Sequence, residues 1–280
     1  MKSISLVAII FAFLALLGTP AHAGGAWSGF YVGGNAGYAW GSDKSTLSIT
    51  DGPTLLNCHF CNPSDIAAAA SGGSISSSPD GFTGGGELGY NWQASNWVYG
   101  AEFDFEAFSQ SQTANNNISL PVNPGGSTGC TVGVTPVPCV ASFSTSVKTD
   151  WLLTIRPRIG YAWGQTLAYV TGGLAVTRLN FSQSYADNIN WGASAGGSLT
   201  TSASKTRAGW VIGGGVEQGL GSHWSLKAEY LYVRFNGLND NSTLTHAYPG
   251  GTDFANFSNN IDHLSSNIVR VGLNYRFGRP

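Results

Sequence analysis

The sequence has very little charge. Only 10% of its 280 residues are Asp, Glu, Lys or Arg, against roughly 25% in an ordinary soluble domain. It has a single Met and no run of basic residues, so it lacks the electrostatic footprint of a nucleic-acid-binding protein. No apolar run approaches the ~20 residues that a membrane-spanning helix requires. The sequence therefore predicts neither a nucleic-acid partner nor a transmembrane helix.

The N-terminal segment has the features of an export signal. Lys2 precedes an apolar run from Ile4 to Leu17, and Ala21-His22-Ala23 forms an A-x-A cleavage site. We therefore expect residues 1–23 to be a signal peptide and residues 24–280 to form one exported domain.

What the sequence does contain is two-residue alternation. In the last such segment, Asn267–Phe277, one face consists of Val269, Val271, Leu273, Tyr275 and Phe277. The opposite face is polar, as in a β-strand with one apolar side. An apolar face ending on an aromatic residue is typical of the strand that closes a transmembrane barrel.

Eight segments alternate in this way. They are Gly29–Trp40, Phe82–Trp92, Trp97–Glu106, Lys148–Trp163, Thr166–Arg178, Arg207–Glu217, Trp224–Tyr232 and Asn267–Phe277. Long polar connections alternate with tight turns between them, as in barrels with long outer loops and short periplasmic turns. We predict an all-β, eight-stranded antiparallel up-and-down transmembrane barrel in the cell outer membrane. Its partners would be the lipid bilayer and the outer-membrane barrel assembly machinery; the sequence does not determine its oligomeric state.

Tryptophans gather at the predicted strand ends. Trp92, Trp97, Trp163 and Trp224 flank the tight turns, whereas Trp40, Trp151 and Trp210 lie toward the long connections. Such positions predict two aromatic girdles, one at each membrane interface.

The charged residues of the strands fall opposite the apolar face. The predicted inward set is Glu87, Glu102, Asp104, Glu106, Lys148, Asp150, Arg156, Arg158, Arg207, Glu217, Lys227, Glu229, Arg270 and Arg276. Since a charge in lipid costs several kcal/mol, these side chains should face the lumen. An eight-stranded lumen is only wide enough for side chains to fill, so we expect a charge-paired plug. A narrow ion-conducting path between the charges is the alternative.

Pro157 has no N–H to donate to a neighbouring strand, which predicts a bulge there.

The long connections carry the cysteines and most histidines. Cys58 and Cys61 lie in the first connection, and Cys130 and Cys139 in the second. In the oxidising periplasm we expect disulfides, and we prefer the local pairs 58–61 and 130–139 among three connectivities. His59, His223, His246 and His263 lack zinc-ligand spacing. We therefore predict no metal site, no cofactor and no enzyme.

Three segments resemble a known family. Residues 27–33 (Trp-Ser-Gly-Phe-Tyr-Val-Gly), 151–161 (Trp-Leu-Leu-Thr-Ile-Arg-Pro-Arg-Ile-Gly-Tyr) and 271–277 (Val-Gly-Leu-Asn-Tyr-Arg-Phe) are similar to the small outer-membrane β-barrel family of porin-like immunogenic surface proteins in Gram-negative bacteria. The resemblance implies an integral barrel with antigenic surface loops and no catalytic residues. Haem binding or modest pore activity is attributed to some members.

Three functions follow from these observations. The first is a structural, surface-exposed porin-like protein with a charge-plugged lumen. The second is a narrow ion-conducting porin. The third is a ligand (haem) or adhesion receptor that acts through its loops. The residues that suggest the third are Trp191, His246, Tyr248, Phe254, Phe257 and His263.

Overall fold

The computed structural model describes residues 26–51, 60, 63–120, 131–132, 135–136, 138–191, 194–248 and 251–277. The elements are β1 (Gly29–Asp51), α2 (Pro63–Gly73), β2 (Ile75–Ser77), β3 (Asp80–Ala94), β4 (Trp97–Phe108), β5 (Ser111–Ser119), β6 (Thr131–Val132), β7 (Thr135–Pro136), β8 (Val140–Trp163), β9 (Thr166–Asp187), β10 (Asn190–Trp191), β11 (Ser194–Ala195), β12 (Ser198–Gly219), β13 (Trp224–Tyr248) and β14 (Gly251–Arg276). The predicted signal peptide lies outside the described residues. Within those residues, no helix combines the length and hydropathy that crossing a bilayer requires.

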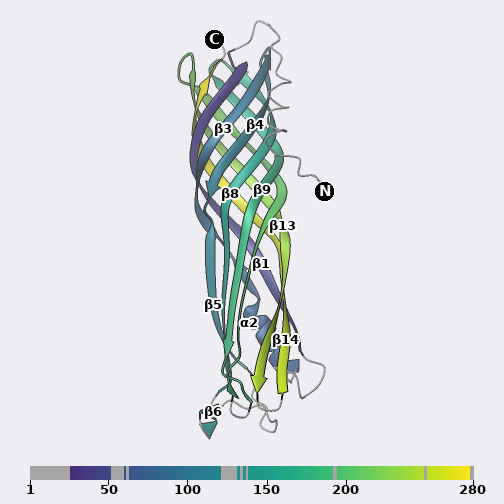
Figure 1. Cartoon of the computed structure of the whole chain (residues 1–280). Coiled ribbons are helices and arrows are strands. Elements are labelled where there is room, and N and C mark those ends of the chain that lie inside the picture. The colour runs from purple at the N-terminus through teal and green to yellow at the C-terminus, as the bar shows by residue number, and fades with distance from the viewer. Residues whose placement is uncertain are drawn as a thin grey trace, which may run out of the picture.

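Eight of the strands close into a ring. Their order is β1-β14-β13-β12-β9-β8-β4-β3, and antiparallel pairing of β3 with β1 completes the circuit. Figure 1 shows these strands tilted and crossing around the barrel. A closed ring satisfies every backbone group between strands, which a lipid environment demands. The prediction of an eight-stranded antiparallel barrel is therefore confirmed.

Tight turns join the strands at one end of the barrel. Ser95 has a φ of 56°, and Gly164 and Gly221 have φ angles of 63° and 120°. Positive φ angles of this kind let the chain reverse direction within a few residues, and glycine adopts them most readily. They lie in the three short connections that the sequence predicted, between β3 and β4, β8 and β9, and β12 and β13.

The strands continue well beyond their apolar alternation. The connection predicted over Asn236 to about Ser266 is mostly a β-hairpin, in which β13 and β14 stay paired as far as Tyr248 and Gly251. Outward side chains there, such as Asn241, meet water instead of lipid. Backbone pairing therefore persists without the hydrophobic alternation by which the sequence reveals a strand.

The ring opens into two sheets in this outer region. Pairing of β12 with β13 stops at Gly209 and Phe235, and pairing of β1 with β3 stops at Trp40 and Asp80. Farther out, β2 pairs with β1 while β5 pairs with β8. One sheet is then β2-β1-β14-β13 and the other is β12-β9-β8-β5. Figure 1 shows the strands separating into two groups toward the end at which α2 lies.

A hydrophobic core joins the two sheets. We call it the outer core; its buried members are Leu47, Ile49, Phe60, Ala69, Leu120, Cys139, Ala141, Phe143, Tyr185, Ile189, Leu244, Ala255 and Phe257. Phe257 contacts Tyr185 across the two sheets, with ring centroids 5.2 Å apart. The part that projects from the membrane is thus a folded sandwich with its own core.

Helix α2 fills the opening between β1 and β5. Pro63 begins the helix and Asp65 lies in its first turn, both favourable at a helix N-terminus. The helix packs on β1, β5 and β8. Asn116 and Gln183 donate side-chain hydrogen bonds to the carbonyls of Gly72 and Gly73, at 3.0 and 3.3 Å. The sequence analysis missed this helix, although Pro63 followed by an alanine run was a usable signal.

A β-bulge corrects two predictions. The register of β8 against β9 shifts between Thr149 and Leu152, whereas it is the same on both sides of Pro157 and the pairing of β8 with β4 is continuous there. The bulge predicted at Pro157 is therefore wrong. A shift of one residue exchanges the two faces of a strand, so Lys148 and Asp150 are exposed on the outside. Their predicted inward orientation is wrong for this reason.

Seating of α2 depends on the absence of a side chain at Gly73. A Cβ there would lie 2.2 Å from Leu47 Cδ2 and 2.9 Å from Phe143 Cε1. We expect Gly73→Val to weaken docking of the helix by about 1–3 kcal/mol through overpacking. Limited elastase digestion of the refolded barrel should then cleave the alanine-rich helix faster. Ala67→Val, on the exposed side of α2, should digest like the wild type; equal digestion of both variants would contradict this seating.

Candidate functional site

The barrel interior holds a buried group of ion pairs, which we call the charge cluster. Its acids are Glu87, Glu102, Asp104, Glu106, Glu217 and Glu229, and its bases are Arg156, Arg158, Lys227 and Arg270. They come from β3, β4, β8, β12, β13 and β14, whose alternation turns these positions inward. Every one of these side chains is at most 1% exposed.

Two arginines connect the acids of opposite walls. Arg270 Nη2 lies 2.6 Å from Asp104 Oδ1, and Arg270 Nε donates to Glu229 Oε2 at 2.8 Å. Arg156 Nη2 lies 2.9 Å from Asp104 Oδ2, while its Nη1 lies 3.1 Å from Glu229 Oε1. Arg156 also pairs with Glu102, and Arg270 with Glu106. These charge-assisted contacts cross-link β4, β8, β13 and β14 through the lumen.

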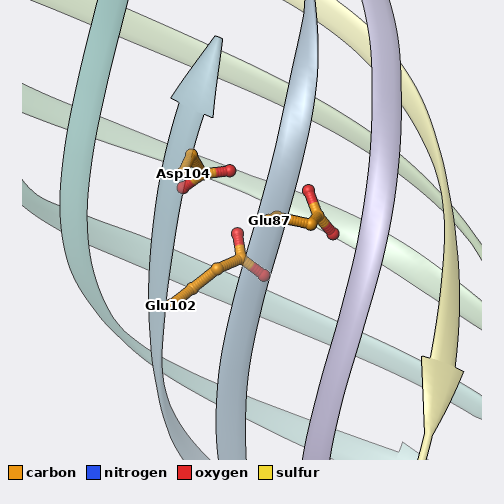
Figure 2. Close-up of side chains that lie close together, drawn as sticks. All are labelled: Glu87, Glu102 and Asp104. Carbon is orange, nitrogen blue, oxygen red and sulfur yellow. The ribbon is translucent and has the colours of Figure 1, made fainter.

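Three carboxylates converge within the cluster. Glu87, Glu102 and Asp104 place oxygens within 4.8 Å of one another. Figure 2 shows these three side chains lying close together. This spacing suits a metal ion, but the ammonium of Lys227 already lies 2.5 Å from Glu87 and 3.2 Å from Glu102. Arg270 contacts Asp104. The protein's own cations thus balance this group, and we assign no metal to it.

The acids outnumber the bases by six to four, and neutral groups take up the excess acceptor oxygens. Tyr31 donates to Glu102 at 2.6 Å, and Tyr169 donates to Glu229 at 2.8 Å. The guanidinium of Arg158 lies over both tyrosine rings, 4.6 and 5.1 Å from their centroids. Further donors to cluster carboxylates are Asn35, Thr83, Thr154 and Ser225.

An apolar layer covers the charge cluster on its outer side. The next inward positions are Leu231 after Glu229 on β13, Ile268 before Arg270 on β14, and, beyond Thr154, Leu152 on β8. This layer comprises Ala39, Phe108, Val147, Leu152, Ala175, Leu179, Phe181, Val211, Leu231, Val233, Phe235, Leu238, Ile261, Leu264 and Ile268. Among the described residues, the lumen is therefore charged at mid-membrane and apolar toward the outside.

Trp27 is buried inside the barrel at the end where the tight turns lie. It is 1% exposed and packs with Val98, Ala162, Leu167 and Tyr169. The guanidinium of Arg276 lies 4.5 Å from the Trp27 ring centroid and donates to Ala26 O at 2.7 Å. Sequence reasoning gave Trp27 no role in the lumen, because it precedes the first alternating segment.

The remaining predicted inward residues lie outside the cluster. Arg276 belongs to the Trp27 end. Arg207 is half-buried on β12, and its Nε is buried without a hydrogen-bond partner in the described part of the chain. Neither joins the described ion pairs.

The predicted girdle tryptophans lie on the outside of the barrel. Trp40, Trp92, Trp97, Trp163, Trp210 and Trp224 are each between 42% and 52% exposed, and Trp151 is half-buried. Val269, Val271, Leu273 and Phe277 of the closing strand are exposed, with Tyr275 half-buried beside them. Twelve residues separate Trp151 from Trp163, a height of roughly 30 Å for a strand tilted by ~40°.

The structure describes one of the cysteines. Cys139 is disulfide-bonded, whereas Cys58, Cys61 and Cys130 lie outside the described residues, as does His59. The pairing 58–61 and 130–139 stays a prediction.

The two histidines suggested for haem lie far apart along the β13–β14 hairpin. His246 pairs with Asp253 and His263 with Asn236, so the two histidines are ten positions apart along the hairpin, roughly 33 Å. Phe257 is 1% exposed in the outer core. The two histidines therefore cannot bind one haem together.

Together, the closed ring, the apolar outer face and the buried charges define an integral outer-membrane β-barrel. Residues 9–277 match the family described as outer membrane protein beta-barrel domain. The chain belongs to that family and is located in the outer membrane.

Named relatives agree with this class. The chain is 33% identical over 257 residues to the 31 kDa outer-membrane immunogenic protein of Brucella melitensis, covering 90% of this chain and 84% of the relative. It is 24% identical over 261 residues to the 22 kDa outer membrane protein of Rhizobium leguminosarum, covering 92% and 82%. Among solved structures, it is similar to the outer membrane protease OMPT from Escherichia coli, with 11% identity, a TM-score of 0.41, and coverage of 93% and 99%.

Removal of the Lys227 charge should disturb the cluster, because its ammonium lies against Glu87 and Glu102. Lys227→Met leaves these buried carboxylates without that counterion, and we expect the barrel to lose about 3–5 kcal/mol of stability. Urea unfolding of protein refolded into phospholipid vesicles measures this loss. Lys44→Met removes an exposed lysine and should change stability by no more than about 0.5 kcal/mol. Equal stability of the two variants would rule out a structural role for the ion pairs.

Proposed function

We propose that this protein is a structural, surface-exposed barrel with a closed lumen, and that its contacts with the outside are made by the projecting sandwich. The observation that carries the proposal is the fully buried charge cluster beneath a continuous apolar layer. Charges that satisfy one another, as Arg270 does with Asp104 and Glu229, are unavailable to passing ions.

The narrow-channel alternative requires a wet path along the lumen. Such a path would have to pass Phe108 and Phe235, which are 0% and 1% exposed, and would also have to displace Trp27. Passage of ions through an apolar constriction is opposed by dewetting. These features favour the closed barrel over the porin.

We infer a non-enzymatic role. The acids of the charge cluster are buried against arginine and lysine, so none is free to exchange protons with a substrate. The relative named as an outer-membrane immunogenic protein supports a role as a surface antigen, and the projecting β-hairpins are the segments most accessible to antibodies.

Measurement of single-channel conductance tests whether the lumen is closed. Refolded protein in a planar bilayer should give no discrete current steps, while heat-modifiable migration in detergent demonstrates that it is folded. Salt-dependent steps that survive repeated purification would favour the narrow porin. If such steps arise from this lumen, Lys227→Met should change their ion selectivity, because it changes the charge of the cluster.

Epitope insertion tests the exposure of the sandwich. A peptide epitope placed between Tyr248 and Gly251, at the end of the β13–β14 hairpin, should be labelled by antibody on intact cells. The same epitope in the Leu220–His223 turn should be labelled only after the outer membrane is permeabilised. Labelling of the second insertion on intact cells would mean that the barrel has the opposite orientation in the membrane.

A further inference from the structure

Exposed basic residues lie on one side of the barrel wall. Lys148, Arg178, Lys205 and Arg234 are all exposed. They belong to β8, β9, β12 and β13, which are consecutive neighbours in the ring. We call these four residues the basic arc.

The basic arc lies at the level of the outer girdle and immediately beyond it. Arg234 is directly opposite Trp210 across β12 and β13. Arg178 is opposite Thr206, four positions farther out than Trp210, and Lys148 is opposite Asn180. Because aromatic girdles mark the membrane interface, these cations lie at the depth of the outer-leaflet headgroups.

The arc carries an excess of positive charge. Neutral acceptors engage two of its members: Arg178 Nε donates to Ser204 Oγ at 2.8 Å, and Lys205 Nζ donates to Asn239 O at 3.2 Å. Of the nearby acids, Asp150 accepts a hydrogen bond from Asn180. The half-buried Asp240 accepts one from Thr201.

The remaining strands of the ring, of which β14 borders β13 of the arc, carry a different balance of exposed charge. At the same level, β1, β14 and β3 expose Lys44, Asp262 and Asp80, so acids outnumber bases there. Cations that served only solubility would be expected on all sides of the barrel and not on four adjacent strands.

The opening between β12 and β13 adds a second feature. Pairing of these strands stops at Gly209 and Phe235, and Arg207 lies half-buried at this point, behind the arc. Its Nε has no hydrogen-bond partner among the described residues. This guanidinium adds positive charge behind the arc, which attracts anions to the surface in front of it.

We propose that the basic arc binds the phosphate groups of a phosphorylated lipid in the outer leaflet of the outer membrane. The acyl chains would lie along the apolar wall below Trp210, and the phosphates would contact Arg178, Arg234 and Lys148. Lys205, exposed on β12 between Arg178 and Arg234 in the strand order, supplies a fourth cation. The placement of the cations at headgroup depth favours a lipid over a dissolved anion.

The experiment uses the full mature barrel refolded into phosphatidylcholine vesicles that contain 5% lipid A, a bisphosphorylated glycolipid. After gentle detergent extraction, the lipid A that co-purifies is quantified by native mass spectrometry. We expect the triple variant K148Q/R178Q/R234Q to retain at least about tenfold less lipid A than the wild type, because each lost charge weakens attraction to the headgroup. Retention should also fall as salt increases.

Two matched controls make the result decisive. Lys44→Gln removes one exposed lysine from the other side, and should retain lipid A like the wild type, whereas Lys148→Gln should retain less. Lipid A stripped of its phosphates should not be retained selectively by any of these proteins. Heat-modifiable migration confirms that each variant is folded.

Three outcomes would overturn the proposal. Equal losses in Lys44→Gln and Lys148→Gln would mean nonspecific attraction. Unchanged retention in the triple variant would place the lipid elsewhere. Displacement of lipid A by millimolar inorganic phosphate would identify a site for dissolved anions instead of a lipid site.

Discussion

The absence of water from the hydrocarbon layer is the constraint on which this structure depends. Backbone groups in that layer must pair with one another, and the ring supplies this pairing only where lipid surrounds it. Pairing of β1 with β3 ends at Trp40, pairing of β4 with β8 ends at Trp151, and pairing of β12 with β13 ends beside Trp210. The barrel therefore ceases to be a closed ring at its outer girdle. Beyond that level water can satisfy free strand edges, and the chain forms a two-sheet sandwich.

The same constraint explains the lumen. The charged face of each strand cannot meet lipid, so ten charged side chains meet inside a space that side chains alone can fill. Burying them is tolerable only because each has partners, including hydroxyl donors such as Tyr31 and Thr154 for the carboxylates. The apolar layer lies between the cluster and the outer end of the barrel, and low-dielectric surroundings of this kind strengthen ion pairs.

Most of the barrel could be predicted from sequence because the bilayer imposes alternation on it. Outward and inward residue types alternate regularly from Trp97 to Glu106, and the structure exposes and buries them in the same alternation. The bulge at Thr149–Leu152 could not be predicted, since a polar stretch outside the lipid tolerates either face and gives no warning of a register shift. Pro157 was misleading for the opposite reason: its missing N–H suggested a bulge, yet its carbonyl is paired, accepting a hydrogen bond from Thr171. The outer strands and α2 left little periodic signal, because their order comes from the outer core and not from a lipid boundary.

The charge cluster has a consequence for how the protein is made. Its contacts join residues that are distant in the chain: Lys227 and Glu102 are separated by 125 positions, and Arg270 and Asp104 by 166. A partly assembled sheet lacking β14 has no Arg270 to offer Asp104, and its inward charges remain hydrated. Insertion hairpin by hairpin would carry these bare charges into lipid at a large cost. The last strand must therefore arrive before water leaves the interior, which makes desolvation of the lumen a late, concerted event in biogenesis and the C-terminal strand its trigger.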